Sequence, residues 1–167
     1  MKKIGVFFGS TSGKSGAIAE EIEFYLKKED VSIHNVADGL DNIKSYNNLI
    51  FISPTYGVGE LQKDWESHID TLKNIDMSGK IIGLIGLGNQ YAFGESYVGA
   101  IKILYDIIIK NNGKVIGFTP SEGYLYKESE AVIDGKFVGL ALDEENQRNQ
   151  TPDRIKNWIV EIISLFN

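Results

Sequence analysis

Short, nearly continuous apolar runs recur along the chain, and patterns typical of helices separate them. The runs cover residues 4–8, 49–52, 81–87 and 115–118. Such runs are typical of strands that are covered on both faces, as in a parallel sheet. The segment Val31–Val36 is more mixed, because apolar and polar residues alternate in it, as expected of a strand at a sheet edge.

Four amphipathic patterns predict helices between these strands. Their apolar stripes are Ile18, Ile22, Tyr25 and Leu26; Leu61, Trp65, Ile69 and Leu72; Ile101, Leu104, Tyr105 and Ile108; and Ile155, Trp158, Ile159, Ile162 and Ile163. The last helix is expected to have Thr151 as N-cap and Pro152 at its first position. Alternating strands and helices predict an α/β fold, a doubly wound five-stranded parallel sheet with helices on both faces.

One interval, residues 119–150, contains no amphipathic helix. It holds a further strand candidate, Phe137–Leu142, which follows a turn at Asp134-Gly135. We interpret the interval as a long insertion in or after the fifth strand. In open α/β sheets ligands bind beyond the carboxyl ends of the strands, so the loops after the first, third and fourth strands are where a site is expected.

Length and composition limit the classes of protein that remain. The 167 residues predict a single domain, 1–167, and the net charge of −6 argues against nucleic-acid or anionic-membrane partners. There is no cysteine and there are only two histidines, which excludes disulfides and thiolate chemistry and argues against a multi-histidine metal site. We read no export signal and no membrane span, and expect a cytoplasmic monomer. The negative net charge suits a basic or redox protein partner better.

The first loop, Gly9-Ser10-Thr11-Ser12-Gly13-Lys14-Ser15, follows a strand and opens a helix. Amides at a helix N-terminus face any anion that is placed there. The loop lacks the glycine spacing of the NTPase loop, since Phe8 stands where the earlier glycine is needed. It does not read Gly-x-Gly-x-x-Gly either, so the dinucleotide fingerprint also fails. It suits a single phosphate monoester, and a plain turn with an N-cap is the alternative.

The other two loops are rich in glycine and aromatic residues. They run from Ser53 to Trp65 and from Gly86 to Tyr97. Beside a phosphate loop they predict a flat ring clamped between aromatic side chains. A phosphoacceptor receiver domain, which shares this strand order, needs acidic residues at the ends of the first and third strands, and the chain has none there.

Together the three loops resemble those of flavodoxins over essentially the whole chain. The family's phosphate loop is matched by Ser10, Ser12, Gly13 and Ser15. Its second loop is matched by Pro54, Thr55, Gly59, Glu60, Asp64 and Trp65, and its third by Gly86, Gly88 and Gln90. The segment 131–147 is similar to the inserted loop of the long-chain class. The resemblance implies the strand order 2-1-3-4-5.

The resemblance further implies non-covalently bound FMN and a one-electron carrier rather than an enzyme. The implied partners are a flavodoxin reductase or low-potential oxidoreductases. The implied phosphate site is Ser10, Thr11, Ser12, Gly13, Lys14 and Ser15. The implied ring site is Pro54, Thr55, Tyr56, Gly57, Val58 and Gly59 on one side, and Leu87, Gly88, Asn89, Gln90, Tyr91 and Phe93 on the other.

Three positions depart from the family pattern. Tyr56 replaces a tryptophan, Asn89 replaces an aspartate, and Phe93 falls where a tyrosine usually stacks, while a tyrosine occurs two places earlier at Tyr91. Either Tyr91 or Phe93 is expected to cover the ring, and the register favours Phe93.

Acidic residues around these loops are expected to form a docking face. They are Glu60, Asp64, Glu66, Glu95, Glu122, Asp143, Glu144 and Glu145. We identify no nucleophile, triad or carboxylate dyad. The rival interpretation is an FMN-dependent quinone or azo reductase, which needs one open face of the flavin for a nicotinamide; a binding module without redox function is a third.

Overall fold

The computed structural model describes all 167 residues and centres on a parallel sheet. Its strands are β1 (Lys3–Phe8), β2 (Asp30–Asn35), β3 (Asn48–Tyr56), β5 (Ile81–Leu87), β6 (Lys114–Ile116) and β10 (Leu140–Leu142). The order is β2-β1-β3-β5, and both β6 and β10 pair with the free edge of β5. The predicted five-stranded order is therefore confirmed, with β2 at one edge and the fifth strand in two pieces.

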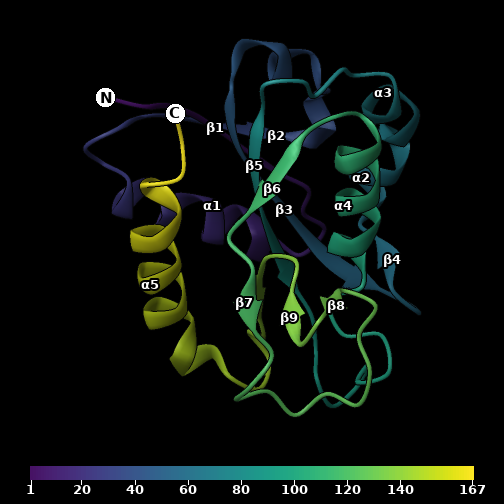
Figure 1. The fold of residues 1–167 in the computed structure, drawn as a ribbon. Helices are drawn as coiled ribbons and strands as arrows, with labels where there is room; N and C mark the ends of the chain where they lie inside the picture. The colour runs from purple at the N-terminus through teal and green to yellow at the C-terminus, as the bar shows by residue number, and fades with distance from the viewer.

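The insertion interrupts the fifth strand rather than following it. Strand β6 pairs with the start of β5 and β10 with its end. Between them the chain forms a small antiparallel sheet of β7 (Thr119–Pro120), β8 (Val132–Ile133) and β9 (Lys136–Phe137), drawn below the main sheet in Figure 1. The turn at Asp134-Gly135 is confirmed, because both residues have positive φ, 51° and 78°.

Two predicted strand boundaries in this region are wrong. The strand expected over residues 115–118 ends at Ile116, because the carbonyl of Gly117 accepts a 2.8 Å hydrogen bond from Trp158 Nε1 instead of continuing the ladder. The strand expected over residues 137–142 divides into β9 and β10, which belong to different sheets.

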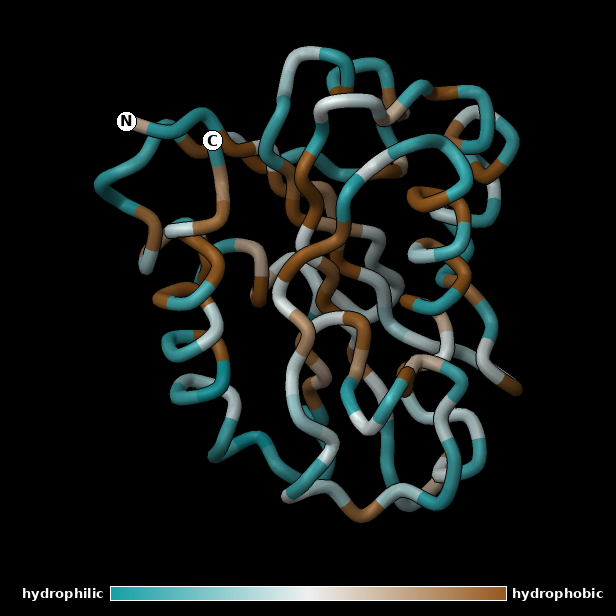
Figure 2. Tube along the Cα trace, in the orientation of Figure 1, coloured by the Kyte–Doolittle hydropathy of each residue, from teal (hydrophilic) through white to brown (hydrophobic).

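Helices cover both faces of the main sheet (Figure 1). Helices α1 (Lys14–Tyr25) and α5 (Thr151–Ile163) pack on one face, while α2 (Lys63–Ser67), α3 (Ile69–Lys73) and α4 (Ala100–Lys110) pack on the other. Alternate residues of a strand enter opposite layers: Leu49 and Phe51 of β3 join the second layer, Ile50 and Ile52 the first. Figure 2 shows the resulting apolar centre and polar periphery.

Two expectations about helices are corrected. The stripe from Leu61 to Leu72 is not one helix, because Leu61 lies in β4 (Glu60–Leu61), antiparallel to β3, and the backbone leaves the helical region at His68 (φ −109°, ψ 12°). Thr151 is the first residue of α5 rather than its cap, since a 3-10 turn (Arg148–Gln150) leads into the helix. Further 3-10 turns span Val36–Asp38 and Asp41–Ser45.

None of the helices combines the length and the apolar character that crossing a membrane requires.

Candidate functional site

The three predicted loops meet at the carboxyl edge of the main sheet. There they line a cavity of about 290 Å³. Its lining is Ser12, Lys14 and Ser15 from the first loop; Pro54, Thr55 and Tyr56 from the second; Leu87, Gly88, Asn89 and Phe93 from the third; and Glu144 and Glu145 after β10. The structure thus brings together ten of the eighteen residues that the sequence assigned to a cofactor, from all three loops.

The first loop presents free donors at the start of α1. The amides of Lys14, Ser15 and Gly16, in the first turn, have no carbonyl acceptor in the structure. The Ser15 side chain is 1% exposed and its hydroxyl has no hydrogen-bond partner. Buried polar groups are normally paired, so an unpaired hydroxyl lining a cavity indicates a ligand that completes it.

The shape of the loop depends on Gly13. This residue caps α1 in the left-handed region, with φ 88° and ψ −7°, and its amide donates a 2.9 Å hydrogen bond to Ser10 Oγ. Successive amides in such a turn form a concave anion site. The Ser10 hydroxyl therefore supports the loop from within, while Thr11 and Ser12 are exposed.

Lys14 is the basic residue of the cavity. Its ammonium group forms an ion pair with Glu145, and both side chains are about half exposed (46% and 51%). This pair joins the first loop to the turn after β10. A dianionic phosphate at the start of α1 would compete with the Glu145 carboxylate for the same cation.

The second loop is shorter than the sequence suggests, because β3 continues through Tyr56. Residues 57–59 form a tight connection to β4, where Tyr56 pairs with Glu60. Thr55 Oγ1 accepts a 3.1 Å hydrogen bond from the amide of Ala100, the first residue of α4. The Val58 side chain is 87% exposed and lines a neighbouring hollow rather than the cavity.

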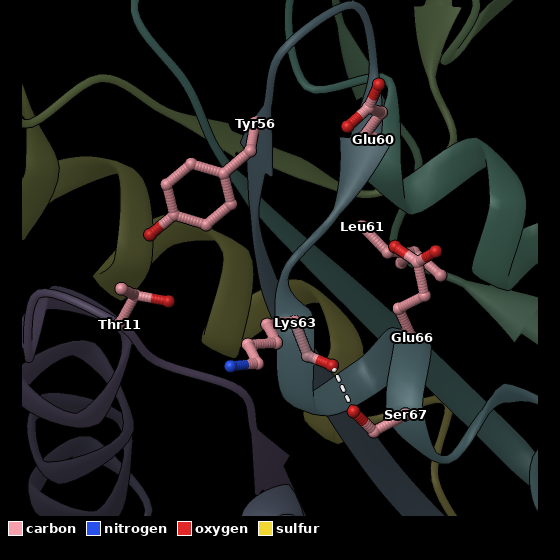
Figure 3. Close-up of a pocket in the computed structure, with 7 residues that line it drawn as sticks. All are labelled: Thr11, Tyr56, Glu60, Leu61, Lys63, Glu66 and Ser67. Carbon is pink, nitrogen blue, oxygen red and sulfur yellow. Dashed lines mark hydrogen bonds between the residues drawn. The ribbon is translucent and has the colours of Figure 1, made fainter.

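Tyr56 stands between two depressions. It lines the cavity described above and also a wider cleft of about 540 Å³, whose other lining residues are Thr11, Glu60, Leu61, Lys63, Glu66 and Ser67 (Figure 3). In that view the hydroxyl end of the Tyr56 ring points toward Thr11 of the first loop. With 37% of its surface exposed, Tyr56 offers an aromatic face to a ligand.

The two aromatic residues of the third loop, Tyr91 and Phe93, lie in different surroundings. Phe93 lines both the cavity and the adjoining hollow, whereas Tyr91 lines that hollow, with Gln90 and Leu125, but not the cavity. Phe93 is 50% exposed, so its ring is available opposite the second loop. The Asn89 side-chain oxygen accepts from the amides of Tyr91 (3.1 Å) and Ala92 (2.9 Å), which means that Asn89 shapes its own loop.

The Gln90 side chain is bonded within the protein and does not line the cavity, where the sequence predicts it. It is 2% exposed, and its side-chain amide donates to Asp143 Oδ2 (2.9 Å) and to Gln147 Oε1 (2.8 Å). Its side-chain oxygen accepts from the Leu125 amide. These bonds use the side chain within the protein.

The acidic face predicted from the sequence loses one member. Asp143 is fully buried (0% exposed), because both of its oxygens accept hydrogen bonds from the chain. Glu60, Glu66, Glu95 and Glu122 are exposed, as a docking face requires. Gln62, which is 1% exposed and contacts the first loop, was not predicted as a site residue. Asp143 and Gln62 both stand in polar stretches of the sequence, where nothing distinguishes them from surface residues.

The residues present fit an FMN molecule. An unpaired buried hydroxyl, free helix amides and a lysine meet the needs of a phosphate monoester. Tyr56 and Phe93 line the same cavity, as a planar ring system requires.

A doubly wound parallel sheet with a loop of free amides and two aromatic loops at its carboxyl edge defines the class of nucleotide-binding α/β proteins. Comparison with known proteins narrows this class. The flavodoxin family model matches residues 6–158. The flavodoxin of Nostoc sp. is 39% identical over 166 residues, 99% of this chain and 98% of that protein. The flavodoxin of Buchnera aphidicola is 41% identical over 169 residues, 100% and 99% of the two chains.

A solved structure agrees. The Fusobacterium nucleatum flavodoxin bound to flavin mononucleotide has 50% sequence identity and a TM-score of 0.97, and all of each chain is covered. The chain therefore belongs to the flavodoxin family. This confirms the family resemblance of its three loops.

Proposed function

We propose that this protein binds FMN non-covalently and carries single electrons between redox proteins. The observation that carries the proposal is the convergence, in one cavity, of the unpaired Ser15 hydroxyl with the rings of Tyr56 and Phe93. The similar Fusobacterium nucleatum flavodoxin is bound to flavin mononucleotide, which supports the same cofactor here.

Different segments of the chain would hold the phosphate and the ring of the cofactor. The phosphate would lie against residues 10–15, held by the amides of the first turn of α1, Ser15 Oγ and Lys14. The ring would lie between residues 54–59 and 87–93, with Tyr56 and Phe93 as its aromatic neighbours. Gln90 would act through its backbone, since its side chain is used within the protein.

FMN would supply the redox chemistry, and the protein would tune it. The exposed carboxylates of Glu60 and Glu95 lie beside the second and third loops, and no lysine or arginine occurs among residues 53–59 or 86–93. Aromatic neighbours and nearby carboxylates disfavour additional negative charge on a buried ring. The loops would also exclude water from the ring. These features favour electron transfer at low potential.

The proposed partners are a flavodoxin reductase or low-potential oxidoreductases with a basic docking surface. The exposed carboxylates of Glu60, Glu66 and Glu95 lie around the second and third loops, where the ring edge would be closest to a partner. Opposite charges steer such encounters and set their orientation. We propose that residues 1–167 act as one domain and as a monomer.

The test separates this carrier from an FMN-dependent reductase. FMN, riboflavin and ATP are titrated into the apoprotein by calorimetry, and NADPH is then added anaerobically to the FMN complex. We expect FMN to bind much more tightly than riboflavin, no binding of ATP, and a flavin that stays oxidised until a reductase protein is added. Rapid bleaching by NADPH alone would show a reductase, and equal affinity for riboflavin would remove the phosphate role of the first loop.

A further inference from the structure

Asp143 is a fully buried carboxylate at the carboxyl end of β10. In the sheet register Leu142 pairs with Leu87, the last residue of β5, and the amide of Gly88 donates a 3.0 Å hydrogen bond to the Leu142 carbonyl. Asp143 therefore lies directly beside the start of the third loop. It is separated from that loop in sequence by the whole insertion.

One oxygen of Asp143 holds the third loop. Asp143 Oδ2 accepts hydrogen bonds from the Gln90 backbone amide (3.0 Å), from Gln90 Nε2 (2.9 Å) and from Asn146 Nδ2 (2.9 Å). Asn146 Nδ2 also donates to Asn89 Oδ1 at 2.8 Å. The carboxylate thus contacts Gln90 directly and Asn89 through one amide.

The other oxygen of Asp143 holds the turn that follows β10. Asp143 Oδ1 accepts from the amides of Glu145 (3.1 Å) and Asn146 (3.0 Å). All five partners of the carboxylate are N–H donors, which is the pattern of a group that only accepts, an ionised carboxylate. A buried charge of this kind is tolerated because every donor is directed at it.

Asp143 also bears on a departure of the third loop from the family pattern. The third loop has an asparagine, Asn89, where the resemblance led us to expect an aspartate. Asn89 uses its oxygen for the Tyr91 and Ala92 amides and for Asn146. The third loop itself carries no negative charge at this position, and the carboxylate of Asp143, which is bonded to Gln90, supplies one beside the loop.

We propose that Asp143 is a positioning residue for the ring-binding loop, which it fixes through Gln90 and Asn146. The proposal rests on the proposed FMN site, and it assigns to the carboxylate the placement of residues 88–93 rather than contact with the cofactor. Because the third loop would meet the ring and not the phosphate, loss of Asp143 should affect riboflavin and FMN to the same degree.

The test compares Asp143→Asn with Glu130→Gln. The control removes the same charge from an exposed insertion residue that makes no side-chain hydrogen bond. An asparagine can accept for one set of donors only, and its NH₂ group faces the other set. We expect Asp143→Asn to weaken FMN and riboflavin binding by the same factor, about tenfold to a hundredfold. Glu130→Gln should bind both as the parent does.

A second readout does not need the cofactor. In ¹H–¹⁵N spectra of the apoprotein, the Gln90 amide proton should move upfield in Asp143→Asn and lose its protection from exchange, because its charged acceptor is gone. Asn146→Ala, at an exposed position, keeps the buried carboxylate and should weaken both ligands by roughly threefold to tenfold. It supplies the result if Asp143→Asn does not fold.

The outcomes separate the inference from the proposed function. A parent protein that fails to bind FMN contradicts the function itself. The positioning role is overturned if the parent binds FMN and both Asp143→Asn and Asn146→Ala bind FMN and riboflavin as tightly as the parent does. A loss confined to FMN also overturns it, because it would show that Asp143 acts through the Glu145–Lys14 pair at the phosphate loop.

Discussion

The Nε2 atom of Gln62 donates a 3.3 Å hydrogen bond to Oγ1 of Thr11, and so connects the second loop to the first. The same side chain caps α2, because its Oε1 accepts from the amides of Asp64 (3.0 Å) and Trp65 (3.3 Å). Helix α2 carries the fully buried Trp65, whose indole donates to the Ile52 carbonyl at 2.8 Å. One amide therefore links the start of a helix, the core and the proposed phosphate loop.

Replacing Gln62 should lower the stability of the apoprotein. We expect Gln62→Ala to reduce the free energy of unfolding of the apoprotein by about 1–2 kcal/mol, the usual cost of losing a helix cap. Urea denaturation measures it. Lys63→Ala, at the next and exposed position, is the control and should change stability by less than about 0.5 kcal/mol. Equal effects of the two variants would mean that the cap contributes nothing.

Ser15 should show opposite effects on the apoprotein and on binding. Its hydroxyl is buried and unpaired, so Ser15→Ala removes an unsatisfied group and should leave the apoprotein at least as stable as the parent. FMN binding should fall by about tenfold to a hundredfold, because a hydrogen bond to a charged group contributes roughly 1.5–3 kcal/mol. Riboflavin binding should not change. Ser164→Ala, an exposed serine near the C-terminus, is the control. A mutant that binds FMN as the parent does would place the phosphate elsewhere.

Charge reversal on the proposed docking face should slow electron transfer. Glu60 and Glu66 are exposed and line the cleft beside Tyr56. We expect Glu60→Lys combined with Glu66→Lys to slow reduction by a flavodoxin reductase by roughly tenfold at low salt, and the difference to disappear at high salt. Glu161→Lys, on the exposed face of α5, should have little effect. Stopped-flow rates that change neither with salt concentration nor with the double substitution would indicate an apolar docking surface.

His34 should make stability depend on pH. Its Nε2 atom lies 2.8 Å from the Tyr46 hydroxyl, its ring stacks on Phe7 with centroids 4.6 Å apart, and burial lowers its pKa. The unfolded chain therefore binds a proton more readily than the folded one. The contribution of His34 to stability is complete above the unfolded pKa of about 6.5, and it is lost as the pH falls through the lower, folded pKa.

His34→Gln should flatten this dependence. Urea denaturation at about pH 7 and about pH 5 should show a smaller loss of stability on acidification in His34→Gln than in the parent. His68→Gln serves as the control for loss of an imidazole. A parent and a His34→Gln variant that lose the same stability would contradict the assignment.

The sheet and the three loops follow from local features of the sequence. The apolar runs of β1, β3 and β5 are long enough to fix both faces of the sheet, and the proposed phosphate site lies in consecutive residues of the first loop. The end of β6 at Ile116 could not be predicted, since it depends on the tertiary hydrogen bond from Trp158 to Gly117. The break at His68 was also missed, because the apolar spacing of Trp65, Ile69 and Leu72 runs through it unchanged.

Asp143 and Gln62 were not predicted as site residues because their positions depend on tertiary packing. Asp143 stands in a polar stretch that reads as a solvated surface, and only the register of β10 beside β5 buries it. Gln62 likewise depends on how closely α2 approaches the first loop. Residues that bind through consecutive amides are visible in a sequence, whereas residues that position a loop from another strand are not.

The central claim, a one-electron carrier, is tested most directly by spectroelectrochemical titration of the FMN complex at neutral pH. The proposed environment, with carboxylates near the ring and no lysine or arginine in the second and third loop tips, should make the second electron harder to add than the first. We predict two resolved one-electron steps, the second at a clearly lower potential. A single two-electron step would contradict the account.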